Sequence, residues 1–365
     1  MDLMVNKPAL KLTRGFNKSY AGRYYKLLNV SLLAQGQFSV QDNESLKAFQ
    51  NIHKQYTAFI PELTINMVNH QTGRFEHRLN IQYRKYTELP SIWQLAPLVD
   101  SAQQWYYNFG NLNLKASNTH DAGANYTWAQ EHANAARINI TVKTSKTQGY
   151  ISDSSYYNDR GQRIVFPVNV NGYQYINLSA GFEKPVMFRK NLITIMTNVA
   201  FNRNKRPFYV NSVITNSISS VFSAGLNMAY TWNQLLNIQL ANYYNHYQTA
   251  IKGQPDYQSF SNGTSIQLVL GWPKRVKLMS YVDYQLRGGN NNIPEASYII
   301  WNANVAYRFT KSELFEIKVS ANDILNQNTA IDNNVSANTI SIGRISRLQQ
   351  FFMLSLSYFP RKFGL

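Results

Sequence analysis

The sequence contains no cysteine, and this absence removes several classes of protein at once. Without thiols there is no disulfide framework, no zinc site built on thiolates and no cysteine nucleophile. Charge is also scarce, since 15% of the 365 residues are charged, against about 25% in ordinary soluble domains. The chain is nevertheless 14% aromatic, which is too rich in rings for a typical disordered polymer.

Long apolar runs and a leader segment are missing as well. No stretch reaches the roughly 18 consecutive apolar residues of a transmembrane helix. Residues 1–20 lack the basic start, apolar core and small-residue cleavage site of a secretory signal peptide. A protein of the bacterial outer membrane needs a leader to cross the inner membrane. We therefore expect either a soluble protein or a chain whose true N-terminus is missing.

What is present is an unusual mixture of aromatic and polar residues. The chain has 25 Tyr, 19 Phe and 36 Lys and Arg against 19 Asp and Glu, for a formal charge of +17. Its mean hydropathy is −0.36, which is mildly polar. A membrane β-barrel has this kind of composition, because one face of each strand is apolar and the other is wet.

Strict alternation of apolar and polar residues recurs along most of the chain, whereas helical periodicity is rare. Phe315, Ile317 and Val319 alternate with Glu316 and Lys318. The same pattern recurs in 78–84, 137–143 and 236–241. In a strand the two sets point to opposite faces of the sheet. A soluble β-sandwich produces the same alternation, so this pattern alone leaves both folds open.

The predicted strands are long. They cover 24–40, 54–68, 74–86, 118–130, 134–150, 166–182, 190–205, 216–231, 234–249, 257–271, 275–288, 297–309, 313–325 and 348–359, with an earlier strand near 8–16. Soluble sheets usually have strands of about 5–6 residues, whereas a membrane crossing at a tilt needs about 9–11. The pattern therefore predicts about 14 to 16 membrane-crossing strands.

The connections between these strands alternate in length. Short ones are expected at 69–74, 130–133, 231–234, 272–275 and 310–313, with a somewhat longer one at 183–190. Long ones are expected at 41–53, 87–117, 151–165, 206–215, 250–256, 289–296 and 326–347. Short periplasmic turns that alternate with long external loops are typical of outer-membrane barrels. We therefore predict an all-β protein, a transmembrane antiparallel up-and-down β-barrel that occupies 1–365 as one domain.

Three stretches then carry a family resemblance. The first is YRKYTELPSIWQLAPLVD (83–100) followed by FGNLNLK (109–115), the second is NDILNQN (322–328), and the third is RLQQFFMLSLSY (347–358). In this order they resemble the Bacteroidetes outer-membrane β-barrel family related to TonB-dependent receptors. The matching positions, which we expect to be structural or loop positions and not catalytic, are Pro90, Ser91, Gln94, Leu95, Gly110, Asn111, Leu114, Asn322, Asp323, Leu325 and Asn326.

The resemblance implies more than a fold. Such receptors resemble gated barrels of about 22 strands with a plugged lumen. The plug and its energy-coupling segment precede the barrel, so the resemblance implies that this chain is the C-terminal part of a receptor and lacks the plug. It further implies nutrient uptake at the cell outer membrane, contact with outer-membrane lipid and lipopolysaccharide, and coupling to an energy-transducing protein only through the missing plug.

Signals for an enzyme, a metal or a cofactor are weak. No two of the six His stand at the i, i+4 spacing of a helical zinc site, so we expect polar loop or lumen histidines and no metal. No phosphate-binding glycine loop and no nucleophile elbow occurs. We expect no cofactor and no catalytic activity.

The basic charge permits several interpretations. Lys and Arg are scattered along strands and turns, which does not favour nucleic acid. We expect a group of them to face the lumen: Arg78, Arg84, Arg137, Lys143, Arg287, Arg308 and Lys318. They would favour anionic solutes or form a solvated wall with no selectivity, while other cations would meet lipopolysaccharide phosphates. Rival functions are a self-standing porin-like channel, a structural or adhesive barrel and a soluble β-rich binding protein.

Overall fold

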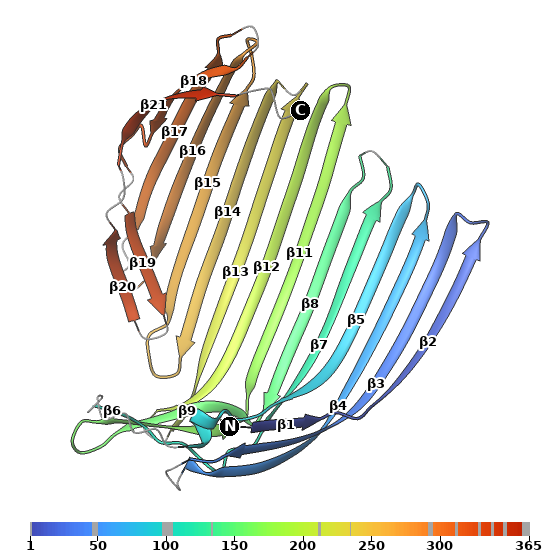
Figure 1. Cartoon of the computed structure of the whole chain (residues 1–365), viewed down its shortest axis with the longest axis vertical. Helices are drawn as coiled ribbons and strands as arrows, with labels where there is room; N and C mark the ends of the chain where they lie inside the picture. Colours follow the sequence, from blue (N-terminus) through green and yellow to red (C-terminus); the bar gives the residue numbers. More distant parts are fainter. Residues whose placement is uncertain are drawn as a thin grey trace, which may run out of the picture.

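The computed structural model is dominated by a curved sheet of long antiparallel strands (Figure 1). It describes residues 2–45, 50–96, 105–132, 134–210, 213–233, 235–290, 295–310, 313–327, 330–336, 339–345 and 349–359. Fifteen wall strands follow one another by antiparallel pairing: β2 (Ala9–Tyr20), β3 (Tyr24–Asn43), β4 (Ile52–Gln71), β5 (Phe75–Glu88), β7 (Ser117–Gln130), β8 (Arg137–Gln148), β11 (Tyr173–Phe188), β12 (Asn191–Val210), β13 (Val213–Trp232), β14 (Leu236–Ile251), β15 (Tyr257–Leu270), β16 (Val276–Gly289), β17 (Ala296–Arg308), β18 (Phe315–Asn322) and β21 (Phe351–Tyr358).

The two ends of this wall differ. Tight turns join the strands at the upper end in Figure 1, and longer connections gather at the lower end. The additional elements at the lower end are β1 (Asp2–Asn6), α1 (Ile92–Leu95), β6 (Tyr106–Asn108), β9 (Tyr150–Tyr157) and β10 (Arg163–Val170). A separate two-stranded sheet consists of β19 (Ala330–Ser336) and β20 (Thr339–Ile345). Below, the end with the tight turns is called the turn end, and the end with the longer connections is called the loop end.

One face of the wall is apolar. The pairing connects Leu28, Met67, Leu79, Tyr126 and Ile140 in a single row across five strands. Large apolar side chains on this face are exposed, and Met67 (45%) and Ile140 (41%) are examples. Exposed apolar rows of this extent are unfavourable in water and are typical of a lipid-facing surface.

The opposite face is polar. The adjacent row on it runs from Asn29 through Asn66, Asn80 and Asn125 to Thr141. Successive residues of a strand point to opposite sides, so the alternation in the sequence produces these two rows directly. The predicted two-faced sheet is confirmed.

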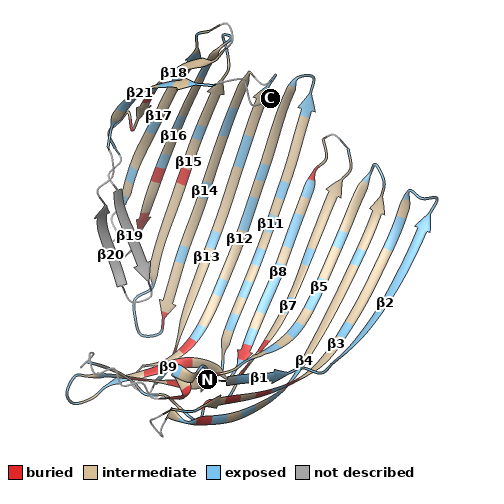
Figure 2. Cartoon of the chain, viewed as in Figure 1, coloured by how far each residue is buried: buried red, intermediate tan, exposed pale blue. Residues whose placement is uncertain are grey.

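The cluster of buried apolar residues in the described part of the chain lies at the loop end. There Leu95 and Leu114 pack with Ile52 and Ala96 in a small buried cluster, and many of the buried residues lie near this end (Figure 2). Among the described residues, no helix has the length and apolarity to cross a membrane. The wall itself is held by backbone ladders and cross-strand pairs, as expected for a single sheet with two solvated or lipid-covered faces.

Several predicted boundaries are wrong at the loop end. The predicted loop 151–165 is largely the hairpin of β9 and β10, and the strand predicted to begin at 166 begins at Tyr173. Gly149 (φ 64°) and Gly172 (φ 107°) adopt backbone angles that bend the chain at the two ends of this insertion. The polar run of β9 indicates a loop, so the sequence pattern does not reveal the hairpin.

Other loops are shorter than predicted. The connection predicted at 206–215 is almost entirely strand, because β12 continues to Val210 and β13 begins at Val213. The predicted loop 326–347 contains β19 and β20. The early strand predicted near 8–16 is β2, and a further strand, β1, precedes it and pairs with the loop end of β3. Pro8 separates β1 from β2, since proline cannot donate to a ladder.

Candidate functional site

The strand register places all seven predicted basic residues on the polar face. Lys143, for example, is opposite Gly123 on one side and Asn177 on the other, and Asn177 is opposite Asn202. Tracing the pairs in this way assigns to one face Arg78 and Arg84 of β5, Arg137 and Lys143 of β8, Arg287 of β16, Arg308 of β17 and Lys318 of β18.

Short amide and hydroxyl side chains bridge neighbouring strands along this face. The bridging pairs are Asn80 with Asn66 at 2.6 Å, Asn125 with Thr141 at 2.8 Å, Asn177 with Asn202 at 2.6 Å and Ser223 with Asn245 at 2.7 Å. Each amide carries two donors and two acceptor sites. The pairs therefore retain hydrogen-bonding capacity for water or a polar solute.

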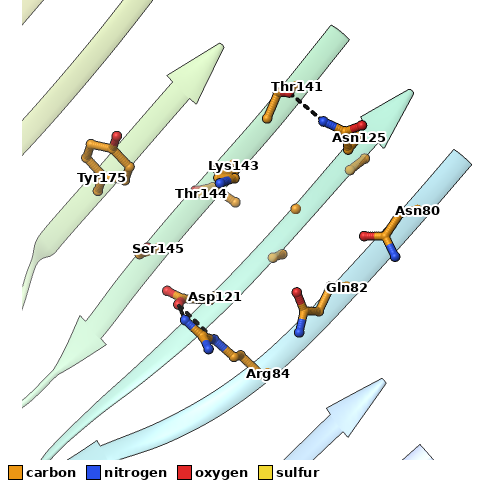
Figure 3. A pocket seen from close by; sticks show the side chains of 13 residues that line it. Asn80, Gln82, Arg84, Asp121, Asn125, Thr141, Lys143, Thr144, Ser145 and Tyr175 are labelled. Carbon is orange, nitrogen blue, oxygen red and sulfur yellow. Dashed lines mark hydrogen bonds and ion pairs between the residues drawn. The ribbon is translucent and has the colours of Figure 1, made fainter. Parts of the chain in front are cut away.

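A shallow hollow of about 330 Å³ lies on the polar face of β5, β7, β8 and β11 (Figure 3). Arg84 and Asp121 lie on its wall, where Nε and Nη2 of the arginine are each 3.4 Å from Oδ2 of the aspartate. Lys143 and Tyr175 line another part of the hollow. Because Asp121 offsets Arg84, the surplus charge in the hollow is that of Lys143.

The other basic residues divide into paired and unpaired groups. Arg78 forms an ion pair with Glu76, and Arg308 Nε is 3.0 Å from Glu316 Oε2. Within the described part of the chain, no ion pair involves Arg137, Lys143, Arg287 or Lys318. These four side chains, which we call the unpaired cations, add positive charge to the polar face, and at Arg137 the carboxylate of Glu183 directly opposite in the ladder offsets part of it.

The motif positions between 90 and 114 form a small cap at the loop end. Ser91 precedes α1, and its backbone N–H donates to Gln94 Oε1 at 2.8 Å. The N–H of Asn111 donates to the carbonyl oxygen of Gln94 at 2.8 Å, and Asn111 Nδ2 donates to the carbonyl oxygen of Pro167 in β10 at 2.9 Å. These bonds join the two halves of the motif to each other and to the β9–β10 hairpin.

Packing reinforces the cap. Leu95 is fully buried and Leu114 is 2% exposed. The carbonyl oxygen of Pro90 accepts a hydrogen bond from Gln41 Nε2 at 3.2 Å, which fastens the cap to β3. At Gly110 a Cβ would lie 2.5 Å from the carbonyl oxygens of Leu95 and Ala96, so only glycine allows this close approach. The structure gives these positions a role in shaping the loop end.

The second motif is a turn at the loop end of β18. Asp323 is buried, and its N–H donates to Asn302 Oδ1 at 2.9 Å. Asp323 Oδ1 in turn accepts from the N–H of Gln327 at 3.0 Å. Asn322 closes the strand, Asn326 has φ 53°, and Leu325 is 42% exposed. Residues 97–100, Asn328, Arg347 and Leu348 of the quoted motifs lie outside the described residues.

One cluster of titratable residues was not predicted. His70, Glu76 and Glu131 each offer a ligand atom within 4.8 Å of the others, at the turn end of the polar face. His70 Nε2 and Glu131 Oε1 are 2.5 Å apart, while Arg78 pairs with Glu76. The set resembles a metal-binding group, but every carboxylate already has a partner. We therefore describe the cluster as a staple, a set of polar contacts that joins the β4–β5 turn to the end of β7. His70 and Glu131 are 61 positions apart, so a local sequence pattern gives no signal for this contact.

The electrostatics of this staple are clear at Glu131, which lies outside the spanning strands. Its Oε2 accepts from the N–H of Gly73 at 2.9 Å. This hydrogen bond and the one from His70 lower the pKa of the Glu131 carboxyl below its ordinary value near 4.5. The charged form thus stabilises the contact between the β4–β5 turn and the end of β7.

Comparison with known families decides the classification. A profile of the outer membrane protein beta-barrel family matches residues 37–358. The chain belongs to this family. As a family member it is an outer-membrane protein, and its curved antiparallel wall is the barrel structure of the family. No curated protein matches the sequence.

Solved structures give only distant similarity. OmpT of Vibrio cholerae is 9% identical with a TM-score of 0.30, covering 98% of this chain and 97% of that chain. FpvA of P. aeruginosa, bound to heterologous pyoverdines, is 8% identical with a TM-score of 0.29, covering 97% and 65%. The copper transporter OprC is 8% identical with a TM-score of 0.28, covering 96% and 72%. The assignment to the family therefore rests on the profile match.

Proposed function

We propose that this chain forms the C-terminal part of the wall of a TonB-dependent-receptor-like barrel that takes up a nutrient. The polar face lines the path of the ligand, and the cap at the loop end contributes to its entrance. The observation that carries the proposal is the single polar face, on which asparagine bridges and four unpaired cations extend over the width of the wall. The order of the three sequence motifs supports the receptor class.

The path would favour polar, anionic ligands. Cations without a carboxylate partner raise the local concentration of anions, and amide side chains replace part of the water around a polar solute. Interaction with the energy-coupling protein would occur through a plug contributed by another segment. The proposal assigns no reaction and no cofactor to the chain.

A deletion strain tests this function. The strain and its parent are grown on limiting concentrations of a panel of single nutrients, and the uptake of each radiolabelled nutrient is measured. We expect the deletion to abolish uptake of at least one nutrient, and the gene supplied on a plasmid to restore it. Equal uptake of every nutrient in both strains would reject transport and favour a structural or adhesive barrel.

A second measurement separates the receptor from a porin-like channel. The purified chain is inserted into planar bilayers, and the current is recorded in potassium chloride. A chain that forms only part of a receptor wall encloses no pore by itself and gives no steady, discrete conductance steps. Reproducible open-channel steps would reject the receptor function and favour the porin-like channel.

A further inference from the structure

Two lysines stand directly opposite each other on the apolar face. Lys18 of β2 pairs with Lys26 of β3, close to the turn end. Like charges opposite each other destabilise an antiparallel pair, and no ion pair in the described part of the chain relieves either one. Lys18 Nζ lies 5.1 Å from the centroid of the Tyr20 ring, and Lys26 Nζ lies 5.6 Å from that of Tyr24.

A hollow of about 600 Å³ opens beside these lysines. At the level of the lysines it is lined by Asn69 and His77, and towards the middle of the strands by apolar residues that include Leu28 and Met67. None of its lining residues is acidic. The hollow therefore has a cationic end and an apolar end, arranged along the strand direction.

The position of the hollow matches a membrane boundary. Tyr20 and Tyr24 form the next row towards the turn, with ring centroids 5.5 Å apart. Aromatic rows of this kind lie at the interface between headgroups and hydrocarbon. Because short turns of outer-membrane barrels face the periplasm, the cationic end lies at the level of the inner-leaflet headgroups.

We propose that this hollow binds an anionic phospholipid of the periplasmic leaflet. Its phosphate lies between Lys18 and Lys26 and removes their mutual repulsion, while Asn69 and His77 offer polar groups at the same level. An acyl chain follows the apolar row that contains Leu28 and Met67. Charge complementarity selects an anionic headgroup over a zwitterionic one. The site lies on the lipid side of the wall and is independent of the transport proposal.

Native mass spectrometry of the refolded full-length chain tests the site. The chain in detergent is titrated with phosphatidylglycerol or with phosphatidylcholine of the same acyl chains, and the lipid-bound fraction is measured. We expect phosphatidylglycerol to bind more tightly, and Lys18→Gln/Lys26→Gln to weaken it by about thirtyfold, since each lysine near an anionic surface contributes roughly a factor of five. Lys18→Arg/Lys26→Arg should retain binding.

The matched control removes an equivalent pair of charges elsewhere on the same face. Lys146 and Lys205 both lie opposite Gln174 on the apolar face near the loop end. Lys146→Gln/Lys205→Gln should leave phosphatidylglycerol binding unchanged. Equal binding by the Lys18/Lys26 variant and the parent, equal binding of the two lipids, or displacement of the lipid by inorganic phosphate alone would each overturn the proposal. Circular dichroism verifies that all variants are folded.

Discussion

A single added methyl group is disruptive where two backbone segments approach closely. Gly110 is such a position, because its neighbours are the carbonyl oxygens of Leu95 and Ala96. We expect Gly110→Ala to displace the cap and to cost about 1–3 kcal/mol of local stability, as overpacking does in other well-packed sites. Limited proteolysis of folded protein should then cut within 89–116 much faster than in the parent.

Gly181 provides the control for this substitution. A Cβ there would lie 3.7 Å from the carbonyl oxygen of Thr197, which is an ordinary contact. Gly181→Ala should leave the proteolysis rate unchanged. Equal rates in the Gly110→Ala variant and the parent would contradict the structural role assigned to the cap.

Glu131 makes the stability of the folded protein depend on pH. The pKa of Glu131 is lowered in the folded protein. Its contribution to the stability of the fold is therefore fully present above its ordinary pKa and is lost as the pH falls through the lowered value. Glu131→Gln should therefore lower the unfolding temperature at pH 7, and the difference from the parent should vanish in strong acid. Thermal unfolding followed by tryptophan fluorescence at several pH values measures this.

Glu88 offers a matched carboxylate for comparison. It is exposed, and its side chain makes no hydrogen bond within the described residues. Glu88→Gln should leave the unfolding temperature at pH 7 unchanged. A Glu131→Gln variant with the same unfolding temperature as the parent at neutral pH would show that the staple contributes nothing.

At the scale of a single strand, stability depends on which face a charge occupies. Ile140 (41% exposed) and Val319 (54% exposed) lie on the apolar face, and Leu240 lies on the same face of β14. Arg at any of these positions should cost about 2–4 kcal/mol if the site is at mid-depth in the bilayer. Urea unfolding of protein refolded in lipid vesicles measures the change.

Polar-face neighbours test the same strands. Asn139→Arg and Gln239→Arg change residues directly beside Ile140 and Leu240 in the sequence, yet they should barely alter folding because both positions face away from lipid. Neutral results for all three apolar-face substitutions would refute the assignment of faces.

Elements could be predicted from the sequence wherever their signal is local. Alternation identifies strands and sorts residues such as Lys143 and Lys318 onto one face, because the side-chain period of a strand is two. The cap could not be predicted, since it depends on contacts such as that of Asn111 with Pro167, 56 positions away. The β9–β10 hairpin was not predicted because the polar run of β9, from Ser152 to Ser155, indicates a loop and not a strand.

At the scale of the whole molecule, the cations of the polar face act together through their summed electrostatic field. The four unpaired cations lie on β8, β16 and β18, far apart in sequence but on one face. Replacing all four by Gln lowers the formal charge of +17 by four. The association rate of pyranine, a small trisulfonated dye, should fall about tenfold or more at low salt and change little at high salt. Stopped-flow fluorescence measures this rate.

A variant that removes charge from the apolar face is the control for this experiment. Lys146→Gln/Lys205→Gln removes two cations from the apolar face and should slow dye association less than Arg287→Gln/Lys318→Gln, which removes two cations from the polar face. Equal slowing by both sets would show that only net charge matters, and not its placement on the polar face.

The β12–β13 hairpin extends farther than a membrane requires. Each of its strands has 20 residues, or about 66 Å of chain at roughly 3.3 Å per residue. With a tilt of about 40° this gives a height of about 50 Å, whereas the apolar band of such barrels is about 25 Å tall. The hairpin is therefore about twice as tall as the apolar band, so the residues near Val210 and Val213 at the loop end lie in water beyond the bilayer.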